Sequence, residues 1–493
     1  MKKKKTVPRL YKGFRDQFAE DVFAREEMLV RIKKAYESYG FAPLETPAVE
    51  FVDVLGKFLP ESQTPEGGIF AFQNEDEEWV ALRYDLTAAL SRVFSQYAEL
   101  ARPFRRYQVG PVWRLEKPGP DHFREFYQFD FDTVGTKSMM ADAEACCVLC
   151  DALEAIGIGR GKYVIKVNNR KALNGVLEAS GVGLIDQDDD DSVAMNVLRS
   201  IDKFDRLGWA GVKELLTTGR KDASGDVMPG LGLEDATVEA IHSYLSIQSN
   251  DRQVVCDQLE KVIGESKIGR EGVAELREID KFLSALGYCS EQVVFDPTVV
   301  RGLGYYTGPV YEAVLTFDVK DEKGRVKSFG SIGGGGRYDG LVKRFTGQET
   351  PATGASIGVD RLLAALKALG EASTRKGAAD VLVSTMDKNH LADYMNMAKE
   401  LRAAGVKTEL YVGNKGVGGQ FKYADKCGIR LVVVAGDDEF SAGEVQIKDL
   451  DQGAELAQEV MDRDVWRKER PAQWAVKRDE LVQACLGRLS EEE

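Results

Sequence analysis

Apolar positions recur at helical spacing in the first part of the chain. Residues 16–38 carry apolar side chains at intervals of three and four, which predicts an amphipathic helix. Asp16 is placed to cap its start, and Gly40 stands where a helix ends. Pro43 and Pro47 then exclude helix, so an extended segment of the kind found at a sheet edge is expected to follow.

The pattern changes to a β-type alternation further along. Residues 104–116 and 125–135 predict two strands joined by the loop 117–124. Residues 137–158 return to helical spacing, and residues 162–167 predict another strand.

A long helical and charged stretch interrupts this pattern between about residue 186 and residue 285, and it opens with the acidic run 186–191. The β-type pattern resumes at 291–300, and a helix is expected from about Arg361. We therefore interpret 186–285 as a helical module inserted into a domain that otherwise contains a sheet.

The segment 370–379 has the composition of a linker. Beyond it, strand-like and helical runs alternate, which is typical of a small α/β domain with a mostly parallel sheet. The pattern predicts a first domain over 1–375, a second over 376–458, and a charged, helical extension of unknown role over 459–493.

Composition changes this picture little. The chain has 493 residues, of which 43% are hydrophobic and 30% charged, as in ordinary globular proteins. No stretch approaches the roughly 18 apolar residues of a membrane span, and Val7, Pro8 and Arg9 stand where a signal peptide needs an apolar run. We therefore expect a cytoplasmic protein without membrane association.

Cysteine and histidine offer little material for catalysis. Cys146, Cys147 and Cys150 lie on the predicted helix 137–158, so we interpret them as reduced core thiols and expect no zinc site. The chain has only 3 histidines, namely His122, His242 and His390, which leaves little for a histidine-driven triad. The chemistry is therefore expected to come from other groups.

The net charge of −14 argues against a generally basic, nucleic-acid-binding surface. One local patch is visible in the sequence, because eight basic residues stand against four acidic ones between Lys388 and Arg430. A solvated face of the α/β domain and a nucleic-acid contact surface both remain open for this segment.

Three arginine-bearing segments are candidates for phosphate chemistry. Arg114 and Glu116 have the two-residue spacing that puts side chains on one face of a strand, and Phe126 could stack on a base. Cross-strand ion pairing is the alternative. The glycines around Arg301 and in the run 333–336 allow close approach of backbone to a ligand, and Arg361 stands at a helix start that favours an anion.

Taken together, these segments resemble the class II aminoacyl-tRNA synthetases, and in particular the histidyl-tRNA synthetase family. The helix and extended segment ending at Pro47 resemble class motif 1, residues 114–126 resemble motif 2, and residues 354–361 resemble motif 3. RGLGYYTG (301–308) and GGGGRYDGL (333–341) resemble the two histidine motifs of the family. The resemblance covers roughly residues 8–458.

The resemblance implies an α+β catalytic domain with a mixed or antiparallel sheet, a helical insertion, and a C-terminal α/β anticodon-binding domain. It implies that histidine and ATP give histidyl-adenylate and pyrophosphate, and that the histidyl group then passes to the 3′ end of histidine tRNA. It further implies a homodimer and Mg²⁺ accompanying ATP.

Site residues are carried over by motif match. Arg114 and Arg301 would be the catalytic residues and would hold the α-phosphate, Phe126 would stack on adenine, and Glu116 would serve adenine or magnesium. The implied ATP-binding residues are Arg114, Glu116, His122, Phe126 and Arg361. The implied histidine-binding residues are Asp85, Thr87, Gln128, Asp132, Arg301, Tyr305, Tyr306 and Tyr338.

Two departures from the family pattern stand out. Gly304 replaces an acidic residue of the first histidine motif, and the loop 118–122 lacks the Gln-x-Gly-Arg run of many bacterial members. We expect the second departure to alter reading of the first base pair or the extra 5′ nucleotide of histidine tRNA. The main alternative function is a histidine-binding regulatory paralogue that charges no tRNA. A class II synthetase for another amino acid is a further alternative, which the two histidine motifs disfavour.

Overall fold

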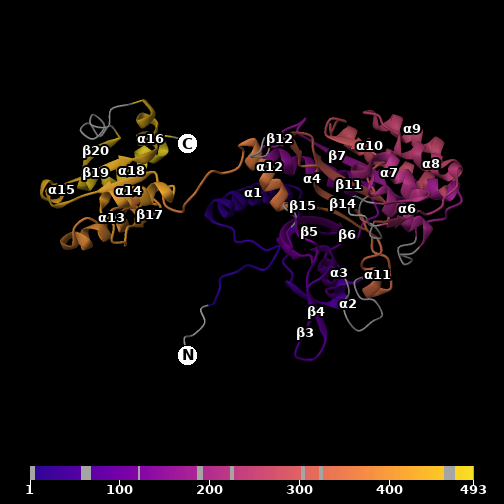
Figure 1. Cartoon of the computed structure of the whole chain (residues 1–493), viewed down its shortest axis with the longest axis horizontal. Coiled ribbons are helices and arrows are strands. Elements are labelled where there is room, and N and C mark those ends of the chain that lie inside the picture. Colours follow the sequence, from indigo (N-terminus) through magenta and orange to yellow (C-terminus); the bar gives the residue numbers. More distant parts are fainter. Residues whose placement is uncertain are drawn as a thin grey trace. The chain divides into compact units, whose positions relative to one another are not determined.

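The computed structural model describes residues 6–56, 68–119, 123–185, 192–221, 227–300, 302, 306–320, 326–459 and 472–491. The chain divides into two compact units (Figure 1). The larger comprises Met1–Asp16 with Glu27–Ala372, and the smaller comprises Gln17–Glu26 with Ser373–Glu493. Within the described ranges, no helix is long and apolar enough to cross a lipid bilayer.

An eight-stranded mixed sheet forms the centre of the larger unit. In spatial order its strands are β1 (Ala42–Pro43), β5 (Phe104–Trp113), β6 (Glu125–Val134), β15 (Ala352–Gly358), β14 (Ser331–Arg337), β11 (Pro309–Leu315), β7 (Tyr163–Asn169) and β10 (Val293–Phe295). The interior pairs are antiparallel, and only the edge strands β1 and β10 pair in parallel with their neighbours. The predicted α+β fold with a mixed sheet is thereby confirmed.

The first helix differs at its start from the sequence prediction. Helix α1 spans Ala19–Ser38, and a backbone hydrogen bond from the Val22 N–H to the Phe18 carbonyl lies at its start. Asp16 therefore lies before the helix and does not cap it. Gly40 adopts φ +79° directly after the helix, as its predicted role as a stop requires. Tyr36 on α1 packs on Phe129 and Phe131 of β6, with ring centroids 4.8 and 5.0 Å away.

Helix α4 (Met139–Ala155) buries Cys146, Cys147 and Cys150, as the packed-helix interpretation predicts. Burial raises the pKa of Cys147 to about 12, which keeps this thiol neutral. In the part of the chain that the structure describes, no cluster of three or more His, Cys, Asp or Glu side chains is arranged to hold a metal ion.

The segment between β7 and β10 is mainly helical. Its helices are α5 (Arg170–Ala179), α6 (Val193–Ile201), α7 (Phe204–Leu216), α8 (Asp235–Leu245), α9 (Arg252–Ile263) and α10 (Lys267–Ala285), with a hairpin of β8 (Gly219–Lys221) and β9 (Val227–Pro229). The acidic run 186–191 lies outside the described residues. Helices α5 and α10 approach closely because both carry glycine at the contact: a Cβ on Gly175 would lie 2.5 Å from the Cα of Gly269.

Short elements complete the larger unit. They are α2 (Val52–Leu55), α3 (Thr87–Gln96), α11 (Lys343–Thr346), α12 (Val359–Leu369), the small sheet of β2 (Val49–Phe51), β4 (Trp79–Leu82) and β3 (Ala71–Gln73), and the hairpin of β12 (Asp318–Lys320) with β13 (Val326–Ser328). The extended segment expected around Pro43 and Pro47 gives way at residues 52–55 to the single helical turn α2, because both prolines lie upstream of this turn and leave its backbone N–H groups free to form it.

The smaller unit is a five-stranded sheet covered on both faces. In spatial order its strands are β17 (Thr408–Leu410), β16 (Val381–Val383), β18 (Leu431–Val434), β19 (Glu444–Asp449) and β20 (Gln473–Lys477). Strand β16 pairs in parallel with β17 and β18, as the predicted mostly parallel sheet requires, whereas β19 pairs antiparallel with both β18 and β20. Residues 473–477, expected to be helical, are a strand because they pair with β19.

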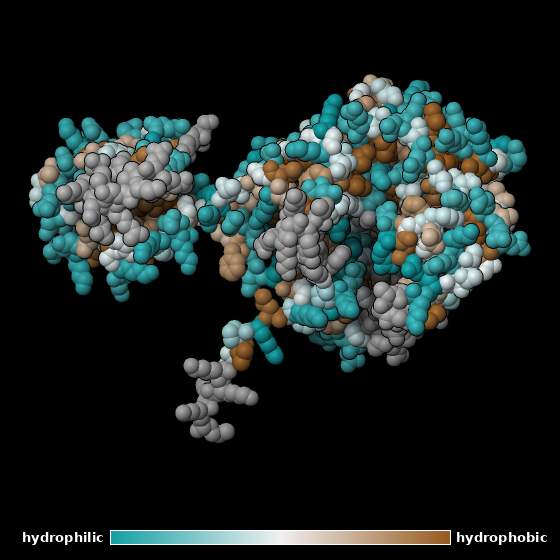
Figure 2. All heavy atoms as spheres, turned by 45° about the horizontal axis from the view of Figure 1, so that its top comes forward, coloured by the Kyte–Doolittle hydropathy of each residue, from teal (hydrophilic) through white to brown (hydrophobic). Residues whose placement is uncertain are grey.

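Helices of the smaller unit form two layers. Helices α13 (Leu391–Ala403) and α18 (Leu481–Ser490) share one core with alternate residues of β16 and β18, and α14 (Val417–Lys426) packs on the other set of residues of the same strands. Its other helical elements are η1 (Lys388–His390), α15 (Asp437–Ala442), α16 (Leu450–Glu459) and η2 (Arg478–Glu480). Hydrophilic side chains are seen around the edge of this unit in Figure 2.

Candidate active site

Strand β6 places a row of polar side chains on one face of the large sheet. Gln128, Asp130 and Asp132 alternate with Phe129 and Phe131, which turn to the opposite face. That opposite face is filled by Tyr36 and other aromatic rings. The polar row is therefore held on a rigid strand whose back is packed by an aromatic core.

Asp132 lies at the centre of this row and is 3% exposed. The Tyr338 hydroxyl donates to one oxygen of its carboxylate, and Nη2 of Arg106 lies 2.6 Å from the other. Burial raises the pKa of Asp132, and the nearby Arg106 and the Tyr338 hydrogen bond oppose that rise. A Cβ on Gly354, the residue paired with Asp132 on β15, would lie 2.2 Å from Oδ1, so only glycine leaves room for this carboxylate.

Tyr306 stands close to the same group. Its ring occupies the space above Gly336, where a Cβ would lie 2.9 Å from the ring. Burial is the main cause that raises the pKa of the Tyr306 hydroxyl, and the negative charge of Asp132 is the second. The structure thus brings together Asp132, Tyr306 and Tyr338, and their role in reading an imidazole stays a prediction.

Gln128 offers an open acceptor at the end of the row. Its Nε2 donates to the Ser356 hydroxyl at 2.7 Å, whereas its Oε1 is buried and has no hydrogen-bond partner among the described residues. A buried acceptor without a partner costs about 1–3 kcal/mol. A bound group that donates hydrogen bonds, such as an ammonium, would satisfy this oxygen.

Asp130 is a site residue that the sequence reasoning missed. It is 2% exposed, and burial raises its pKa to about 7, with Arg106 opposing the rise and Asp132 adding to it. Ser356 is paired with Asp130 across the β6–β15 ladder, and its hydroxyl also opposes the rise of this pKa. Polar residues at every second position of a strand, here 128, 130 and 132, are the signal that could have identified it.

Asp85 and Thr87 lie at the start of α3. The Asp85 carboxylate accepts from the Ala88 N–H at 2.9 Å, and Thr87 is the first residue of the helix. Burial raises the pKa of Asp85, and the Ala88 N–H together with the charges of Arg114 and Arg106 limits the rise. The electrostatic coupling places Asp85 near both arginines.

Arg114 and Phe126 face each other where β5 and β6 meet the loop between them. The Arg114 guanidinium carbon lies 5.2 Å from the Phe126 ring centroid, and its Nε donates to the Tyr84 carbonyl at 3.2 Å. Glu116 is exposed, and its backbone carbonyl accepts from Arg124 at 3.0 Å. Strand β5 ends at Trp113, so the expectation that Arg114 and Glu116 share a strand face is wrong: both follow the strand, and their directions are set by the turn.

Arg361 lies in the first turn of α12, and its Nη1 donates to the Ser331 carbonyl. The preceding residue, Asp360, accepts from the Tyr127 N–H at 2.9 Å and also pairs with Arg15. These contacts join the start of α12 to the start of β6, next to Phe126. The predicted ATP-binding residues Phe126 and Arg361 therefore come from directly connected elements.

Several expected residues lie outside the described residues: His122, Arg301, Gly304 and Tyr305, together with Pro120 and Asp121. Arg170, which the sequence reasoning missed, contacts the chain on both sides of Arg301. Its Nη2 lies 3.2 Å from the Val300 carbonyl and 3.3 Å from the Gly302 carbonyl, and burial lowers its pKa to about 10. No motif marks Arg170, because its role arises from a contact between distant segments.

The glycine run 333–336 forms strand β14, between β11 and β15. A Cβ on Gly335 would lie 2.1 Å from the Gly354 carbonyl oxygen, and one on Gly336 would lie 2.6 Å from the Pro309 carbonyl oxygen. The run therefore admits neighbouring backbone, and through Gly336 it also admits the Tyr306 ring. Close approach of a ligand to this run stays a prediction.

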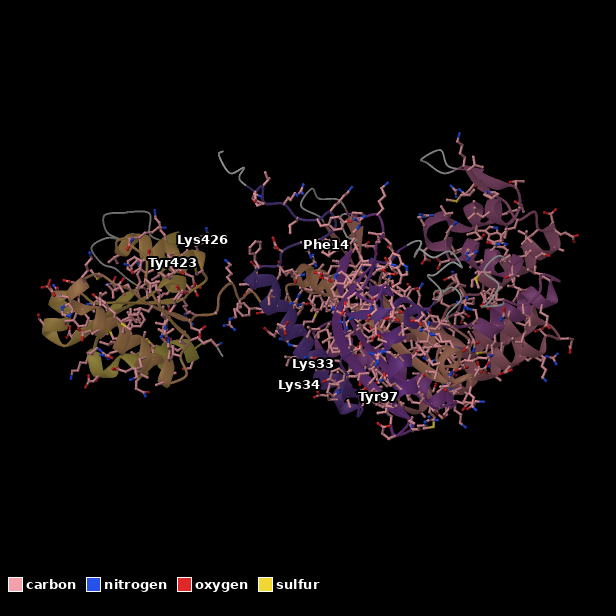
Figure 3. The ribbon with its side chains drawn as sticks, turned by 90° about the horizontal axis from the view of Figure 1, so that it is seen from below. Phe14, Lys33, Lys34, Tyr97, Tyr423 and Lys426 are labelled. Atoms are coloured by element: carbon pink, nitrogen blue, oxygen red, sulfur yellow. The ribbon has the colours of Figure 1, made fainter. Side chains whose placement is uncertain are left out.

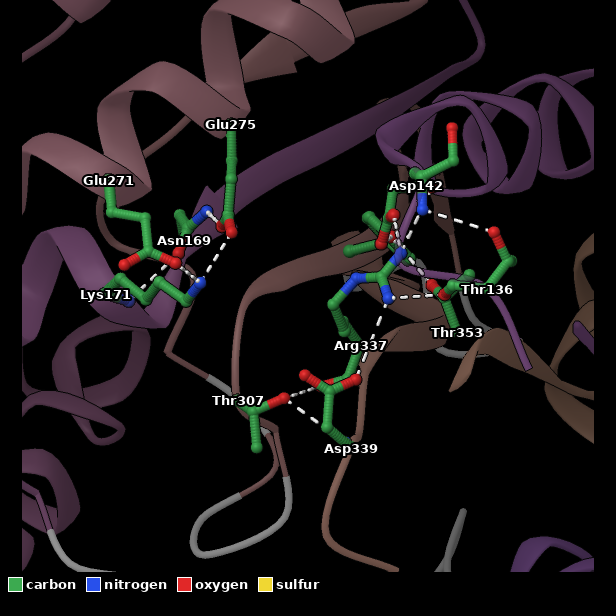
Figure 4. A network of polar contacts seen from close by, with 12 residues as sticks. Thr136, Asp142, Asn169, Lys171, Glu271, Glu275, Thr307, Arg337, Asp339 and Thr353 are labelled. Atoms are coloured by element: carbon green, nitrogen blue, oxygen red, sulfur yellow. Dashed lines mark hydrogen bonds and ion pairs between the residues drawn. The ribbon is translucent and has the colours of Figure 1, made fainter. Parts of the chain in front are cut away.

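A buried network anchors the residue after this run (Figure 4). Arg337 pairs with Asp142 of α4, and its Nη1 also donates to the Thr136 carbonyl at 2.9 Å. Tyr311 donates to the other oxygen of Asp142 at 2.5 Å. Because Arg337 is committed to these partners, its role is to hold β14 and the adjoining Tyr338 in place.

The basic residues between Lys388 and Arg430 do not form one patch. Lys399 and Arg402 lie on α13, and Lys422 and Lys426 lie on α14, which covers the other face of the sheet. Arg430 pairs with Asp449 at 3.2 Å. The expectation of a single basic patch is wrong, because helices that alternate with parallel strands can cover opposite faces of the sheet.

Comparisons with known proteins bear on the family and the fold of the chain. The family model described as histidyl-tRNA synthetase matches residues 13–362, and the model described as an anticodon binding domain matches residues 380–486. A histidine–tRNA ligase of Ruegeria sp. (strain TM1040) is 53% identical over 96% of this chain and 94% of its own length. The histidine–tRNA ligase of Cereibacter sphaeroides is 52% identical over 97% of each chain. The crystal structure of histidyl-tRNA synthetase from Nostoc sp. PCC 7120 superimposes with a TM-score of 0.74 at 29% identity, covering 98% of this chain and 100% of that one.

Proposed function

The chain belongs to the histidyl-tRNA synthetase family, and from this premise we propose how its residues bind histidine, ATP and tRNA. The activity is that of a histidine–tRNA ligase, an ATP-dependent aminoacyl-tRNA synthetase. Relatives with this activity match nearly the full chain at about 50% identity, which favours the ligase over the regulatory paralogue.

The histidine site is proposed to be the polar row of β6 with its tyrosines. A neutral imidazole has one N–H donor and one acceptor nitrogen, so the Asp132 carboxylate and the Tyr306 hydroxyl are complementary to it, with Tyr338 holding Asp132. A ligand without ring nitrogens would leave these buried groups unpaired, at a cost of about 1–3 kcal/mol each. The observation that carries this proposal is the convergence of Asp132, Tyr338 and Gln128 on one sheet face.

The α-amino group is proposed to lie between Gln128 and the start of α3. The open Oε1 of Gln128 and the carboxylate of Asp85 both accept hydrogen bonds, and the Thr87 hydroxyl is the third candidate at this end. Arg301 and Tyr305 are proposed to complete the site by family match. Arg170 supports that segment through the carbonyls of Val300 and Gly302.

Activation of histidine needs positive charge more than a base, because the substrate carboxylate is already an anion when it attacks the α-phosphate. Arg114 and Arg301 are proposed to stabilise the charge that develops there, with Phe126 stacked on adenine. Arg361 and His122 are proposed to hold the γ-phosphate. Histidyl-adenylate and pyrophosphate are the products, and the tRNA 3′ end then accepts the histidyl group.

Mg²⁺ is proposed to accompany ATP, with Glu116 as its protein ligand. Magnesium that arrives with a nucleotide needs only one or two carboxylates, since phosphates and water complete its shell. The exposed carboxylate of Glu116, two residues from Arg114, fits this requirement. The ion would neutralise phosphate charge, while Arg114 and Phe126 orient the nucleotide.

The smaller unit is proposed to bind the anticodon through α14. Lys422 and Lys426 are exposed, and Tyr423, between them in the sequence of this helix, packs edge-on against Tyr411. Figure 3 labels Tyr423 and Lys426. Cations that pair with phosphates next to an aromatic ring suit single-stranded nucleic acid. Strand β20 and α18 belong to this sheet and its core, so we propose that the domain extends beyond residue 458.

We propose that the protein is a cytoplasmic homodimer. Strand β1 is an edge of the large sheet, and the small sheet of β2, β4 and β3 carries the exposed large apolar side chains Val49, Phe51 and Phe72. Such edges and side chains are typical of a surface that pairs with another copy. Light scattering coupled to size exclusion gives the mass: about twice 54.5 kDa is expected, and 54.5 kDa would contradict the dimer.

The deciding experiment for the reaction is ATP–pyrophosphate exchange with each amino acid in turn, followed by charging of histidine tRNA. Exchange that depends on histidine alone, and charging that depends on tRNA, are expected. Exchange with a different amino acid would refute the assignment of the histidine site. Exchange without charging would refute the assignment of the tRNA surface.

A further inference from the structure

A chain of three polar side chains, Gln128, Ser356 and Asp130, lies at the proposed amino-group end of the histidine site. Gln128 Nε2 donates to the Ser356 hydroxyl at 2.7 Å, and no acceptor for the proton of that hydroxyl is found among the described residues. Asp130, directly opposite Ser356, has a buried oxygen, Oδ1, without a hydrogen-bond partner among the described residues. Ser356 is paired directly with Asp130 across the β6–β15 ladder, so the backbone holds the two side chains together. The chain involves no residue that the motifs assign except Gln128.

The direction of this chain depends on Asp130. A hydroxyl has one proton, and an ionised carboxylate only accepts hydrogen bonds. When Asp130 is ionised, Ser356 must donate to it, so Ser356 accepts from the Gln128 amide. The Gln128 Nε2 is then engaged, and its Oε1 is the atom left open and buried.

Protonation of Asp130 removes this constraint. A carboxylic acid can donate to Ser356, which can then donate to the Gln128 oxygen. The amide would turn over and present its N–H group instead of its oxygen. An N–H group repels the donors of an α-ammonium group, whereas the oxygen accepts from them.

We propose that Asp130 is a positioning residue for histidine: its ionised form acts through Ser356 to hold the Gln128 amide with Oε1 directed at the α-ammonium group. This inference rests on the proposed function in one respect, the placement of the amino group at Gln128. It makes histidine binding dependent on a proton held by a residue that does not touch the substrate.

The surroundings of Asp130 place its titration in the neutral range. Burial raises its pKa to about 7, Arg106 of β5 opposes the rise, and Asp132 and Asp85 add to it. The titratable and charged groups that face it are Arg106, Asp132, Asp85, Arg83, Tyr36 and Tyr306. Histidine binding is therefore expected to tighten as the pH rises through 7.

The test is the KM for histidine in ATP–pyrophosphate exchange, measured with the full-length protein from pH 6 to 8.5. At pH 6 about a tenth of Asp130 would be ionised, so its contribution weakens histidine binding by up to about tenfold relative to pH 8. Asp130→Asn offers Ser356 an acceptor oxygen at every pH, so its ratio of KM at pH 6 to KM at pH 8 should be about tenfold smaller. Ser356→Ala breaks the chain and should raise KM and also lose this pH component.

Two controls isolate the effect. Asp235→Asn makes the same change of charge on the exposed start of α8 and should keep the wild-type profile. The inhibition constant of 3-(imidazol-4-yl)propanoate, which has the imidazole but no amino group, should have the same pH profile in wild type and Asp130→Asn. The titration of the substrate's own imidazole is common to all of these proteins and cancels in the comparison.

The outcomes are distinct. Loss of the pH component in both Asp130→Asn and Ser356→Ala supports the inference. An unchanged ratio in both variants, with histidine-dependent exchange intact, overturns the inference and leaves the proposed function standing. Absence of histidine-dependent exchange in the wild-type protein at pH 8 overturns the proposed function, and the inference with it.

Discussion

Asp130 should also make the stability of the larger unit depend on pH in an unusual direction. A carboxyl whose pKa is higher in the folded protein than in the unfolded chain takes up a proton on folding. It therefore adds stability at low pH, and this contribution is lost as the pH rises through the folded value of about 7. Asp449 of the smaller unit acts in the opposite sense, because burial is outweighed there by its backbone hydrogen bond and its arginine partners, which lower its pKa.

The magnitude follows from the shift of the pKa. The value rises from 3.8 to about 7, and each unit corresponds to about 1.4 kcal/mol, so the whole effect is about 4 kcal/mol. Between pH 5.5 and pH 8.5 about 2 kcal/mol of it should be lost. Asp130→Asn keeps the shape of the side chain and has no proton to exchange. The stability of the variant relative to wild type should thus increase by about 2 kcal/mol over this range.

Urea denaturation at the two pH values measures this difference. Tryptophan fluorescence reports on the larger unit through Trp79, Trp113 and Trp209. Comparing the variant with wild type at each pH removes the contribution of all other titrating groups. An equal difference in stability at both pH values would refute the reasoning, because it would mean that Asp130 of the folded protein does not titrate between them. The Asp235→Asn variant should show no such difference.

Three further predictions concern the site and the tRNA surface. Arg170→Met should lower kcat of histidine-dependent exchange by about 10²-fold, since displacing the segment around Arg301 by about 1 Å costs that much; an unchanged kcat would contradict its positioning role. Gly354→Ala should displace the Asp132 carboxylate, cost about 1–3 kcal/mol and raise the KM for histidine more than the KM for ATP; equal changes would contradict the placement of Asp132. Lys426→Glu should reduce tRNA charging and its dependence on salt, and leave exchange unchanged; reduced exchange would contradict the separation of the two functions.

The sequence alone was sufficient for features that depend on neighbouring residues. The helix ending before Gly40, the two strands on either side of residues 117–124, and the parallel strands of the smaller unit were predicted from periodicity and turn residues. The motifs also indicated the family, because they are runs of adjacent residues. Asp132, Tyr306 and Tyr338 were predicted by motif match, and the structure brings them together.

Only the tertiary structure decided which distant groups meet. Asp130 is an ordinary strand carboxylate in the sequence, and its raised pKa arises because the whole sheet excludes water from it. Its contact with Ser356, and that of Arg170 with the carbonyls around Arg301, join segments more than a hundred residues apart. The division of the basic residues between α13 and α14 likewise depends on which face of the sheet each helix covers. Desolvation and long-range pairing are properties of the packed chain, so no local pattern of residues encodes them.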